Sequence, residues 1–394
     1  MAGSSPRPYG SLVSQGHRRT RVAVICGLAL LALVLLIGQF WLMSALSWTH
    51  REPLADSLIG FNFSCDQAEY VLLEKPGDPS SEVPDDRPGR AEWCASVLDR
   101  LLKETGARAV RLSIQWDEVE PREGQFDFSV TDALVHAAGQ NHATVMLSVG
   151  MKAQRHPEYY IPDWATAALD LPDGAVISDS EPLRARALAM IEATVRHYGT
   201  EPVIDSWGAE NEAYIASHRS DRWSLSREYV AAVVGVIHAN DPLGRPVSIN
   251  HAQHFVMDQR WRDALADSDI LGQSMYPHRN GAVFGVKVVA NIMEIGALMP
   301  NYAYQAELAA RAGKQFWVTE LQGEPWTEVD SRLITPENPS DNLVAADLKA
   351  NIRYARRTGA SRIYLWGAEW WLYQQGLGDT SWLNAVRASL PSSR

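Results

Sequence analysis

The chain has 394 residues, a formal net charge of −11 at pH 7 and 46% hydrophobic residues. This length fits one large α/β barrel with an appendage, and the hydrophobic content can supply a sizeable core. The charge is uneven, because residues 1–21 hold four arginines and no acidic residue, which leaves the remainder more acidic than the whole. An acidic remainder argues against nucleic acid or anionic lipid as its partner.

A long uncharged segment follows the arginines. Residues 22–43 read VAVICGLALLALVLLIGQFWLM, and a helix of this length, at about 1.5 Å per residue, would cross the roughly 30 Å core of a bilayer. Arginines flank only its N-terminal side, which predicts a cell-membrane protein with a single span and a cytoplasmic N-terminus. Its parts would be a basic tail at 1–21, a transmembrane helix at 22–43, a linker at 44–56 and an extracytoplasmic domain at 57–390.

A cleavable signal peptide is the competing interpretation of the apolar segment. Signal peptides have shorter apolar regions, of about 7–15 residues, and no A-x-A cleavage site follows this one. Cysteine usage agrees with export, because Cys65 and Cys94 form an even pair in the outer domain once Cys26 is assigned to the apolar segment. An oxidising compartment would allow them to form a disulfide, and two separate buried thiols are the alternative.

Short apolar runs alternate with amphipathic stretches beyond residue 56, which indicates parallel strands joined by crossover helices. We expect eight strands, at 58–63, 107–114, 143–150, 203–210, 246–251, 269–276, 315–321 and 362–370. We expect helices at 91–105, 130–139, 182–198, 226–240 and 343–358, and an apolar helix at 283–299 that buries one face on the barrel. The pattern predicts a (β/α)₈ TIM barrel preceded by one transmembrane helix. An open doubly wound sheet is the alternative, but the Gly-rich phosphate turn that it needs is absent.

Two glutamates end strands on opposite sides of the predicted barrel. Glu212 follows Asn211 at the end of the fourth strand, and Glu320 ends the seventh. Two carboxyl groups across a cleft are what glycosidic-bond cleavage requires, because one protonates the departing oxygen and the other stabilises or captures the sugar cation. We expect Arg111 and the Tyr276 hydroxyl to keep Glu320 ionised, whereas burial and the nearby negative charge would raise the pKa of Glu212.

Three stretches of the chain resemble the clan GH-A glycoside hydrolases, which are retaining enzymes on (β/α)₈ barrels. They are GARAVRLSIQWDEVEPREGQFDFSVTDALV, IDSWGAENE and FWVTELQGEPW, and the resemblance runs from about residue 58 to 382. It implies that Glu212 is the acid/base and Glu320 the nucleophile. Ser274 and Ala213 stand where many members of the clan have His and Pro, which loosens assignment to one family within it.

The same resemblance implies further contacts of the substrate and the nucleophile. Asn211 would bond the sugar 2-hydroxyl, Arg111 and Tyr276 would support the nucleophile, and Trp366 would form the floor of the subsite. Strict strand alternation turns Glu210 and Glu212 to one side and Asn211 to the other, so presenting both Asn211 and Glu212 requires a distorted strand end. Glu210 is the alternative acid.

Two more residues are candidates for binding the substrate. Trp116, one of fourteen tryptophans, could stack on a sugar or pack at the barrel rim, as could Trp370, Trp371 and Trp382. His251 is expected to form hydrogen bonds within the cleft. His251 and His254 have the spacing of a metal-ligand pair, but no third ligand is evident, so we expect no metal and no other cofactor.

These observations predict an O-glycosyl hydrolase that acts on an extracellular or cell-surface polysaccharide or oligosaccharide by double displacement. Its partners would be the carbohydrate substrate and the membrane that holds the N-terminal helix. The alternative is a barrel that binds or transglycosylates glycan during polysaccharide assembly or export, with little hydrolysis.

Overall fold

The protein is described by a computed structural model that covers most of the chain. The described residues are 24–39, 42, 51–54, 56–73, 86–155, 157–217, 222–252, 258–283, 286–291, 300–326 and 330–390.

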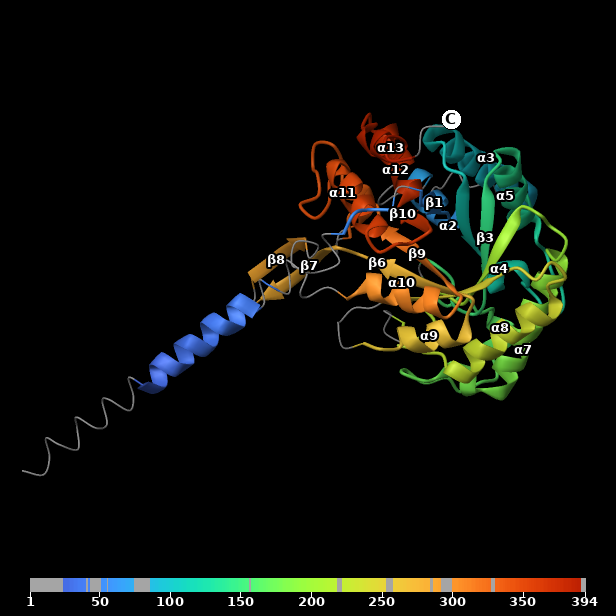
Figure 1. Ribbon diagram of the computed structural model, residues 1–394. Helices are drawn as coiled ribbons and strands as arrows, with labels where there is room; N and C mark the ends of the chain where they lie inside the picture. Colours follow the sequence, from blue (N-terminus) through green and yellow to red (C-terminus); the bar gives the residue numbers. More distant parts are fainter. Residues whose placement is uncertain are drawn as a thin grey trace, which may run out of the picture.

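Eight parallel strands close into a barrel, which confirms the predicted (β/α)₈ barrel (Figure 1). Their order around the barrel is β1-β10-β9-β6-β5-β4-β3-β2. They are β1 (Leu58–Asn62), β2 (Ala109–Ser113), β3 (Thr144–Val149), β4 (Ile204–Ala209), β5 (Val247–Ala252), β6 (Ile270–Met275), β9 (Gln315–Gln322) and β10 (Arg362–Trp366). Since all eight run parallel, their carboxyl ends share one rim.

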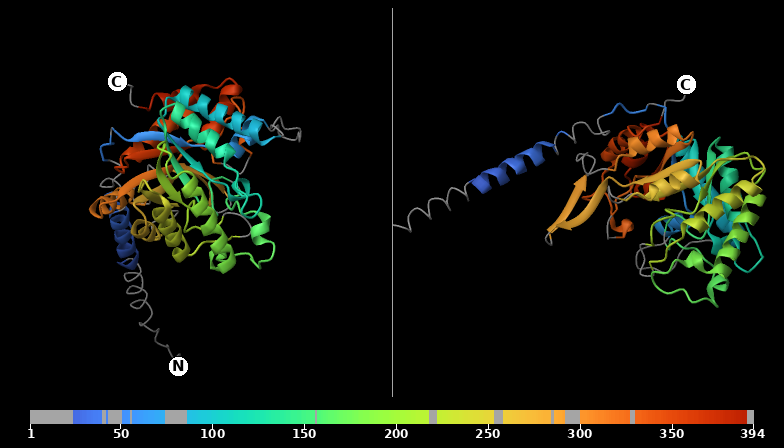
Figure 2. Two further views of the ribbon diagram at one scale, coloured as in Figure 1. Left: turned by 90° about the vertical axis from the view of Figure 1, so that its right-hand side faces the viewer. Right: turned by 60° about the horizontal axis from the view of Figure 1, so that its bottom comes forward.

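Helices cover the outside of the barrel (Figure 2). They are α2 (Cys65–Leu72), α3 (Arg87–Thr105), α4 (Trp116–Val119), α5 (Ser129–Gln140), α6 (Asp163–Thr166), α7 (Glu181–His197), α8 (Arg227–Asn240), α9 (Trp261–Asp267), α10 (Tyr302–Arg311), α11 (Ala345–Arg356), α12 (Ala368–Gly376) and α13 (Ser381–Arg387), with 3₁₀ turns η2 (Ile177–Asp179) and η5 (Ser331–Leu333). The five crossover helices predicted from the sequence are confirmed by α3, α5, α7, α8 and α11.

Local sequence determines where α3 begins and ends. The Asp86 carboxylate accepts the Gly89 N–H at 2.7 Å and caps the first turn. Gly106 ends the helix in the left-handed conformation, with φ of 78°, which costs glycine little. The helix predicted at 91–105 therefore ends where α3 ends but begins four residues too late, because the Asp86 cap was not used in the prediction.

The predicted helix at 283–299 is wrong in the part that the structure describes. An antiparallel pair occupies this region, with β7 (His278–Val283) bonded to β8 (Val286–Asn291). The stretch VKVV at the start of β8 is rich in β-branched valine, which favours strand over helix. Residues 284, 285 and 292–299 of the predicted helix lie outside the described residues.

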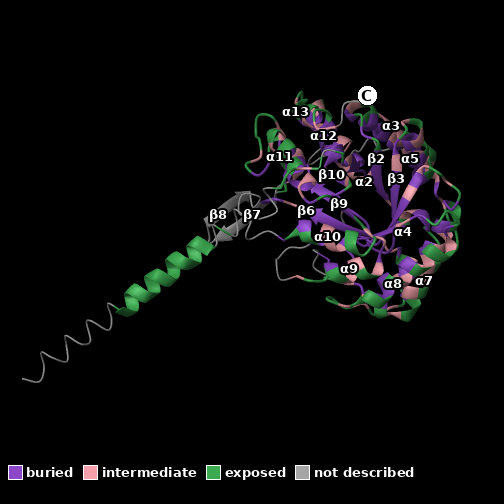
Figure 3. Ribbon diagram, viewed as in Figure 1, coloured by how far each residue is buried: buried purple, intermediate pink, exposed green. Residues whose placement is uncertain are grey.

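The apolar core has two parts, and the strands at the centre are buried while the outer helix faces are exposed (Figure 3). A large cluster lies between the strands and the helices. A smaller cluster fills the barrel interior with side chains from five strands: Ala109, Met146, Ile270, Trp317 and Tyr364. This packing supports the rim, where the polar residues of the predicted site lie.

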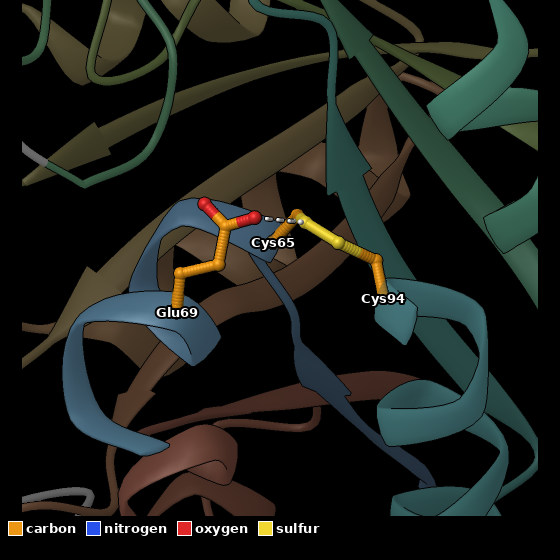
Figure 4. A group of neighbouring side chains, drawn as sticks. All are labelled: Cys65, Glu69 and Cys94. Atoms are coloured by element: carbon orange, nitrogen blue, oxygen red, sulfur yellow. Dashed lines mark hydrogen bonds between the residues drawn. A yellow bond between two sulfur atoms is a disulfide. The ribbon is translucent and has the colours of Figure 1, made fainter. Parts of the chain in front are cut away.

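A disulfide joins Cys65 at the start of α2 to Cys94 in α3, with 5.5 Å between the Cα atoms (Figure 4). Of the two possibilities left by the sequence, the structure therefore contains the disulfide. These sulfurs and the Glu69 carboxylate are the one group of described side chains with metal-ligand spacing, but the sulfurs are bonded to each other. Glu69 pairs with Arg90 instead, through a hydrogen bond of 3.1 Å from Nη2 to Oε2.

Part of the predicted membrane helix is described. Residues 24–39 are helical, and the large apolar side chains from Val24 to Ile37 are 48–65% exposed. No helix within the described ranges has both the length and the apolar character of a membrane span. Residues 1–23, 40, 41, 43–50 and 55, which include the basic tail and much of the predicted linker, lie outside the described residues.

Candidate active site

The predicted site residues converge at the carboxyl rim of the barrel. Arg111 lies in β2, Asn211 and Glu212 directly follow β4, Tyr276 follows β6, and Glu320 lies in β9. All except the half-buried Tyr276 are buried, and Arg111 is fully so. Closure of the sheet therefore gathers residues that are up to 209 positions apart in the chain.

Glu320 is held by two direct donors. Arg111 donates from Nη1 to Oε1 at 2.9 Å, and the Tyr276 hydroxyl donates to Oε2 at 2.8 Å. Arg111 also donates from Nη2 to the Asn211 side-chain oxygen at 2.8 Å. Charge-assisted hydrogen bonds of this length favour the ionised carboxylate. The expected support of Glu320 by Arg111 and Tyr276 is thus present in the structure.

The charge of Glu212 acts on the same site. Burial, and then the charge of Glu212, raise the pKa of Glu320 to about 7, against the lowering effects of Arg111 and the Tyr276 hydroxyl. Burial first, followed by the charges of Glu320 and Glu212, likewise raises the pKa of Tyr276. Two carboxyl groups that interact in this way titrate as a pair, because the negative charge of one raises the pKa of the other. Arg111 and Tyr276 were expected to keep Glu320 ionised, but burial and the Glu212 charge outweigh them and raise the pKa of Glu320.

The end of β4 is distorted, which resolves the conflict with strand alternation. Glu210 and Glu212 both have left-handed backbone conformations, with φ of 60° and 45°. These values are uncommon for residues other than glycine and break the alternating pattern. As a result, Asn211 contacts Arg111 while Glu212 also acts on Glu320.

Glu210 links the ends of two neighbouring strands, β3 and β4. It accepts the N–H groups of Met151 and Lys152, at 3.0 and 2.7 Å, and the Tyr229 hydroxyl at 2.7 Å. Burial raises its pKa to about 7 despite these donors. A Cβ at Gly150 would collide with the Glu210 carboxylate, so glycine is needed there. These contacts hold the end of β4 against the residues that follow β3.

Asn250 in β5 belongs to the site but was missed in the sequence. Its Oδ1 accepts the Glu212 N–H at 2.8 Å, and its Nδ2 donates to the Asn211 side-chain oxygen at 3.3 Å. The neighbouring His251 was expected in the cleft, but its Nε2 lies 3.3 Å from the Asp258 carboxylate. Adjacent strand residues point to opposite faces, so the presence of Asn250 on the cleft side turns His251 away from it. His254 lies outside the described residues.

Trp366 ends β10 and is partly exposed, as a stacking surface requires. The Arg155 guanidinium lies over this ring, 3.9 Å from its centroid. Arg155 pairs with Glu324 and Glu369, each at 2.7 Å. One face of the ring is therefore covered by a cation that two carboxylates hold in place.

Trp116 does not have the exposure expected of a sugar-stacking residue. Its side chain is fully buried, its Nε1 donates to Glu120 at 2.7 Å, and its ring packs edge-on against Trp164. The short helix α4 directs the ring inward, so no face remains for a ligand. The other candidate tryptophans are also buried: Trp370, Trp371 and Trp382.

A different tryptophan is exposed beside the paired glutamates. Trp326 is 53% exposed, and its ring meets that of Tyr276 edge-on at 4.7 Å between centroids. The backbone N–H of Trp326 donates to the side-chain oxygen of the buried Asn342 at 3.1 Å. This bond holds the backbone near the end of β9. The sequence signal was present, since Trp326 closes the GEPW stretch after the predicted seventh strand.

Comparisons with known proteins agree with this architecture. The sequence model of glycoside hydrolase family 42, described as beta-galactosidase, matches residues 94–239. A GH5_18 structure from Streptomyces cattleya in complex with GlcNAc has 14% identity and a TM-score of 0.54, with 86% of this chain and 83% of that chain covered. A GH5_18 variant from Bifidobacterium longum in complex with Manβ1-4GlcNAc has 13% identity and a TM-score of 0.54, covering 84% and 78%.

The beta-galactosidase from Rahnella sp. R3 has 13% identity and a TM-score of 0.52, and the alignment covers 80% of this chain. This chain spans about half of that protein, with 52% covered. At these identities the structural likeness concerns the fold. The family match over residues 94–239 and the closed parallel barrel together support a glycosidase with the fold of the GH-A clan.

Proposed function

We propose that the protein is a retaining glycoside hydrolase in which Glu320 is the nucleophile and Glu212 the acid/base. One observation carries this assignment: Arg111 and Tyr276 donate directly to Glu320, while the charge of Glu212 acts on the same carboxyl. The two carboxyl groups thus differ in surroundings, as the two roles require. Asn211, bonded to Arg111 at 2.8 Å, is the proposed donor to the sugar 2-hydroxyl.

The proposed reaction has two steps. In the first, a Glu320 oxygen forms a bond to the anomeric carbon while the bond from that carbon to the glycosidic oxygen breaks. The electron pair of the broken bond goes to the departing oxygen, which takes the proton of Glu212. In the second step, the Glu212 carboxylate removes a proton from water, the water oxygen bonds to the anomeric carbon, and Glu320 leaves as a carboxylate.

The first substrates to test are β-linked hexosides. The family model is described as beta-galactosidase, and the GH5_18 structures contain GlcNAc or Manβ1-4GlcNAc. For the biological substrate we propose an extracellular or cell-surface polysaccharide or oligosaccharide, because the apolar N-terminal segment would hold the enzyme at the envelope.

Replacing Glu320 with Gln should abolish turnover and leave glycan binding intact. The amide preserves size but lacks the charge that attacks the anomeric carbon, so kcat/KM should fall by roughly a thousandfold or more. The measurement is hydrolysis of aryl β-galactosides and β-mannosides, with binding followed by calorimetry. Glu307→Gln changes an exposed glutamate of α10 and is the matched control, so it should keep the activity of the wild type. If Glu320→Gln left a biological effect unchanged, the binding or assembly alternative would replace hydrolysis.

The pH dependence of kcat/KM should have an ascending limb near pH 7. The pKa of Glu320 is raised to about 7 by burial and by the charge of Glu212, so below this value the proposed nucleophile is increasingly protonated and cannot attack. Activity should therefore rise as the pH rises through about 7. Glu212→Gln removes the charge and, assayed on an activated aryl glycoside, should move this limb to lower pH, whereas His136→Ala on the outer face should leave it in place. A profile that is flat from pH 6 to 8 in the wild type would contradict the coupled pair.

Trp326 should contribute to substrate binding as an exposed aromatic surface beside Tyr276. An aromatic contact worth about 1–1.5 kcal/mol corresponds to roughly a tenfold loss in kcat/KM for Trp326→Ala, mostly through KM. Trp326→Tyr should keep most of the activity. Tyr304, which is 40% exposed on α10, provides the control, because Tyr304→Ala removes an aromatic ring away from the rim. Equal kinetics for Trp326→Ala and wild type would show that the ring makes no contact with the substrate.

We also propose that residues 22–43 tether the protein to the cell membrane with the barrel outside. The segment has no charge, and the large apolar side chains described in it are at least 48% exposed. The full chain should sediment with membranes and resist extraction by alkaline carbonate, while deletion of residues 1–43 should release an active barrel. Protease added outside intact cells should digest the barrel. Recovery of the full chain in the soluble fraction would refute the tether.

A further inference from the structure

Lys152 is buried next to the loop that carries Glu212. It lies three residues beyond the end of β3, and its side chain is 0% exposed. Its ammonium donates to the carbonyl oxygens of Ile215 at 3.0 Å and Glu212 at 3.4 Å, and lies 3.5 Å from the Glu158 carboxylate. A buried ammonium is costly unless such acceptors surround it, so its position is tightly determined by them.

Three different groups of Lys152 contact three consecutive residues after β4. Its N–H donates to the Glu210 carboxylate at 2.7 Å, its carbonyl accepts the Asn211 N–H at 2.8 Å, and its ammonium reaches the Glu212 carbonyl. Glu210 and Glu212 have left-handed backbones, with φ of 60° and 45°. Residues other than glycine keep such conformations only where the surroundings hold them. Lys152 supplies a large share of that support.

The Glu212 backbone is held on both sides. Asn250 accepts its N–H at 2.8 Å, and the Lys152 ammonium donates to its carbonyl. The Glu212 carbonyl also accepts the Ile215 N–H at 3.0 Å, and the Lys152 ammonium bonds the carbonyl oxygens at both ends of this turn. Loss of the ammonium therefore loosens the turn and allows the Glu212 backbone to relax toward an ordinary strand conformation. Strand alternation would then turn the Glu212 side chain to the side that Glu210 occupies, away from Glu320.

We propose that Lys152 is a positioning residue for Glu212, and that its ammonium keeps the Glu212 carboxyl directed at the glycosidic oxygen. This inference rests on the proposed function, because it requires Glu212 to be the acid. Misplacement of the acid should slow cleavage most for leaving groups that must be protonated as they depart. Phenol has a pKa of about 10, as the tyrosine side chain does, so phenolate needs a proton as it departs. Dinitrophenolate is a far weaker base and leaves without one.

The test compares phenyl and 2,4-dinitrophenyl β-glycosides, as galactosides and mannosides, on the full chain and on Lys152→Met. For the phenyl glycoside, kcat/KM should fall about thirtyfold or more, and for the dinitrophenyl glycoside less than about threefold. The ratio of the two values is measured on one sample, so the fraction of folded protein cancels. Methionine fills a similar volume without the charge. Lys152→Gln, which keeps a neutral donor, should give an intermediate ratio and serves as a second variant if the first folds poorly.

Lys314 offers a matched control. Its ammonium donates to the carbonyl oxygens of Leu265 and Ala266, at 2.6 and 2.9 Å, on the outside of the barrel. Lys314→Met removes the same kind of contact and should leave the ratio of the two substrates unchanged. Azide should raise kcat of Lys152→Met on the dinitrophenyl glycoside, because this anion attacks the glycosyl-enzyme without a base.

Several results would overturn the assignment of Lys152. If Lys152→Met lost kcat/KM equally on both substrates, the ratio of the two values would equal that of the wild type. Lys152 would then act only through stability. Failure of the wild type and of Glu320→Gln alike to cleave either substrate would instead refute the proposed function. The two failures are therefore distinguishable.

Discussion

The pairing of Arg111 with Glu320 inside the barrel rim is the interaction on which the site depends. Both side chains are almost inaccessible to solvent, and they meet at 2.9 Å. Removing one partner of such a pair leaves an uncompensated buried charge and typically costs about 3–5 kcal/mol. The pair also links separate strands, because Arg111 bonds Asn62 in β1 and Asn211 after β4. Arg111 is thus a common anchor for the proposed nucleophile and for the loop of the proposed acid.

The second constraint is the local backbone after β4. Two left-handed residues in three positions allow Asn211 and Glu212 to serve the cleft together. Groups from three strands stabilise this conformation: the ends of β3 and β4, and Asn250 in β5. Glu210 also stabilises this conformation, because its carboxylate accepts two backbone N–H groups of the loop after β3. Glu210 therefore holds the loop, whereas Glu212 acts on Glu320.

Much of this architecture could be predicted from the sequence, because the signals are local. Each apolar run corresponds to one strand, and eight of them predict a closed parallel sheet whose rim gathers Arg111, Glu212 and Glu320. The failures concern which way a side chain points. His251 is one residue away from the cleft-facing Asn250, and a shift of one position in a strand reverses the face.

Tertiary packing accounts for the other differences. Trp116 and the exposed Trp326 are chemically alike, and only their burial separates a core ring from a cleft ring. Lys152 and Arg155 lie in the long insertion after β3, where no periodic pattern indicates a structure. Their roles depend on contacts with residues after β4, β9 and β10, which are 60 or more positions away.

The most direct test of the account is covalent trapping of the enzyme with 2-deoxy-2-fluoro β-glycosides carrying a dinitrophenyl leaving group. The fluorine slows both steps, while the activated leaving group allows the first to proceed, so the glycosyl-enzyme accumulates. If Glu320 is the nucleophile, the enzyme should gain the mass of one fluorosugar, located on Glu320 by peptide mapping, and Arg111→Met and Glu320→Gln should not be labelled. Labelling of Glu212 or Glu210, or turnover without any labelling across galactosyl, mannosyl and glucosyl reagents, would contradict it.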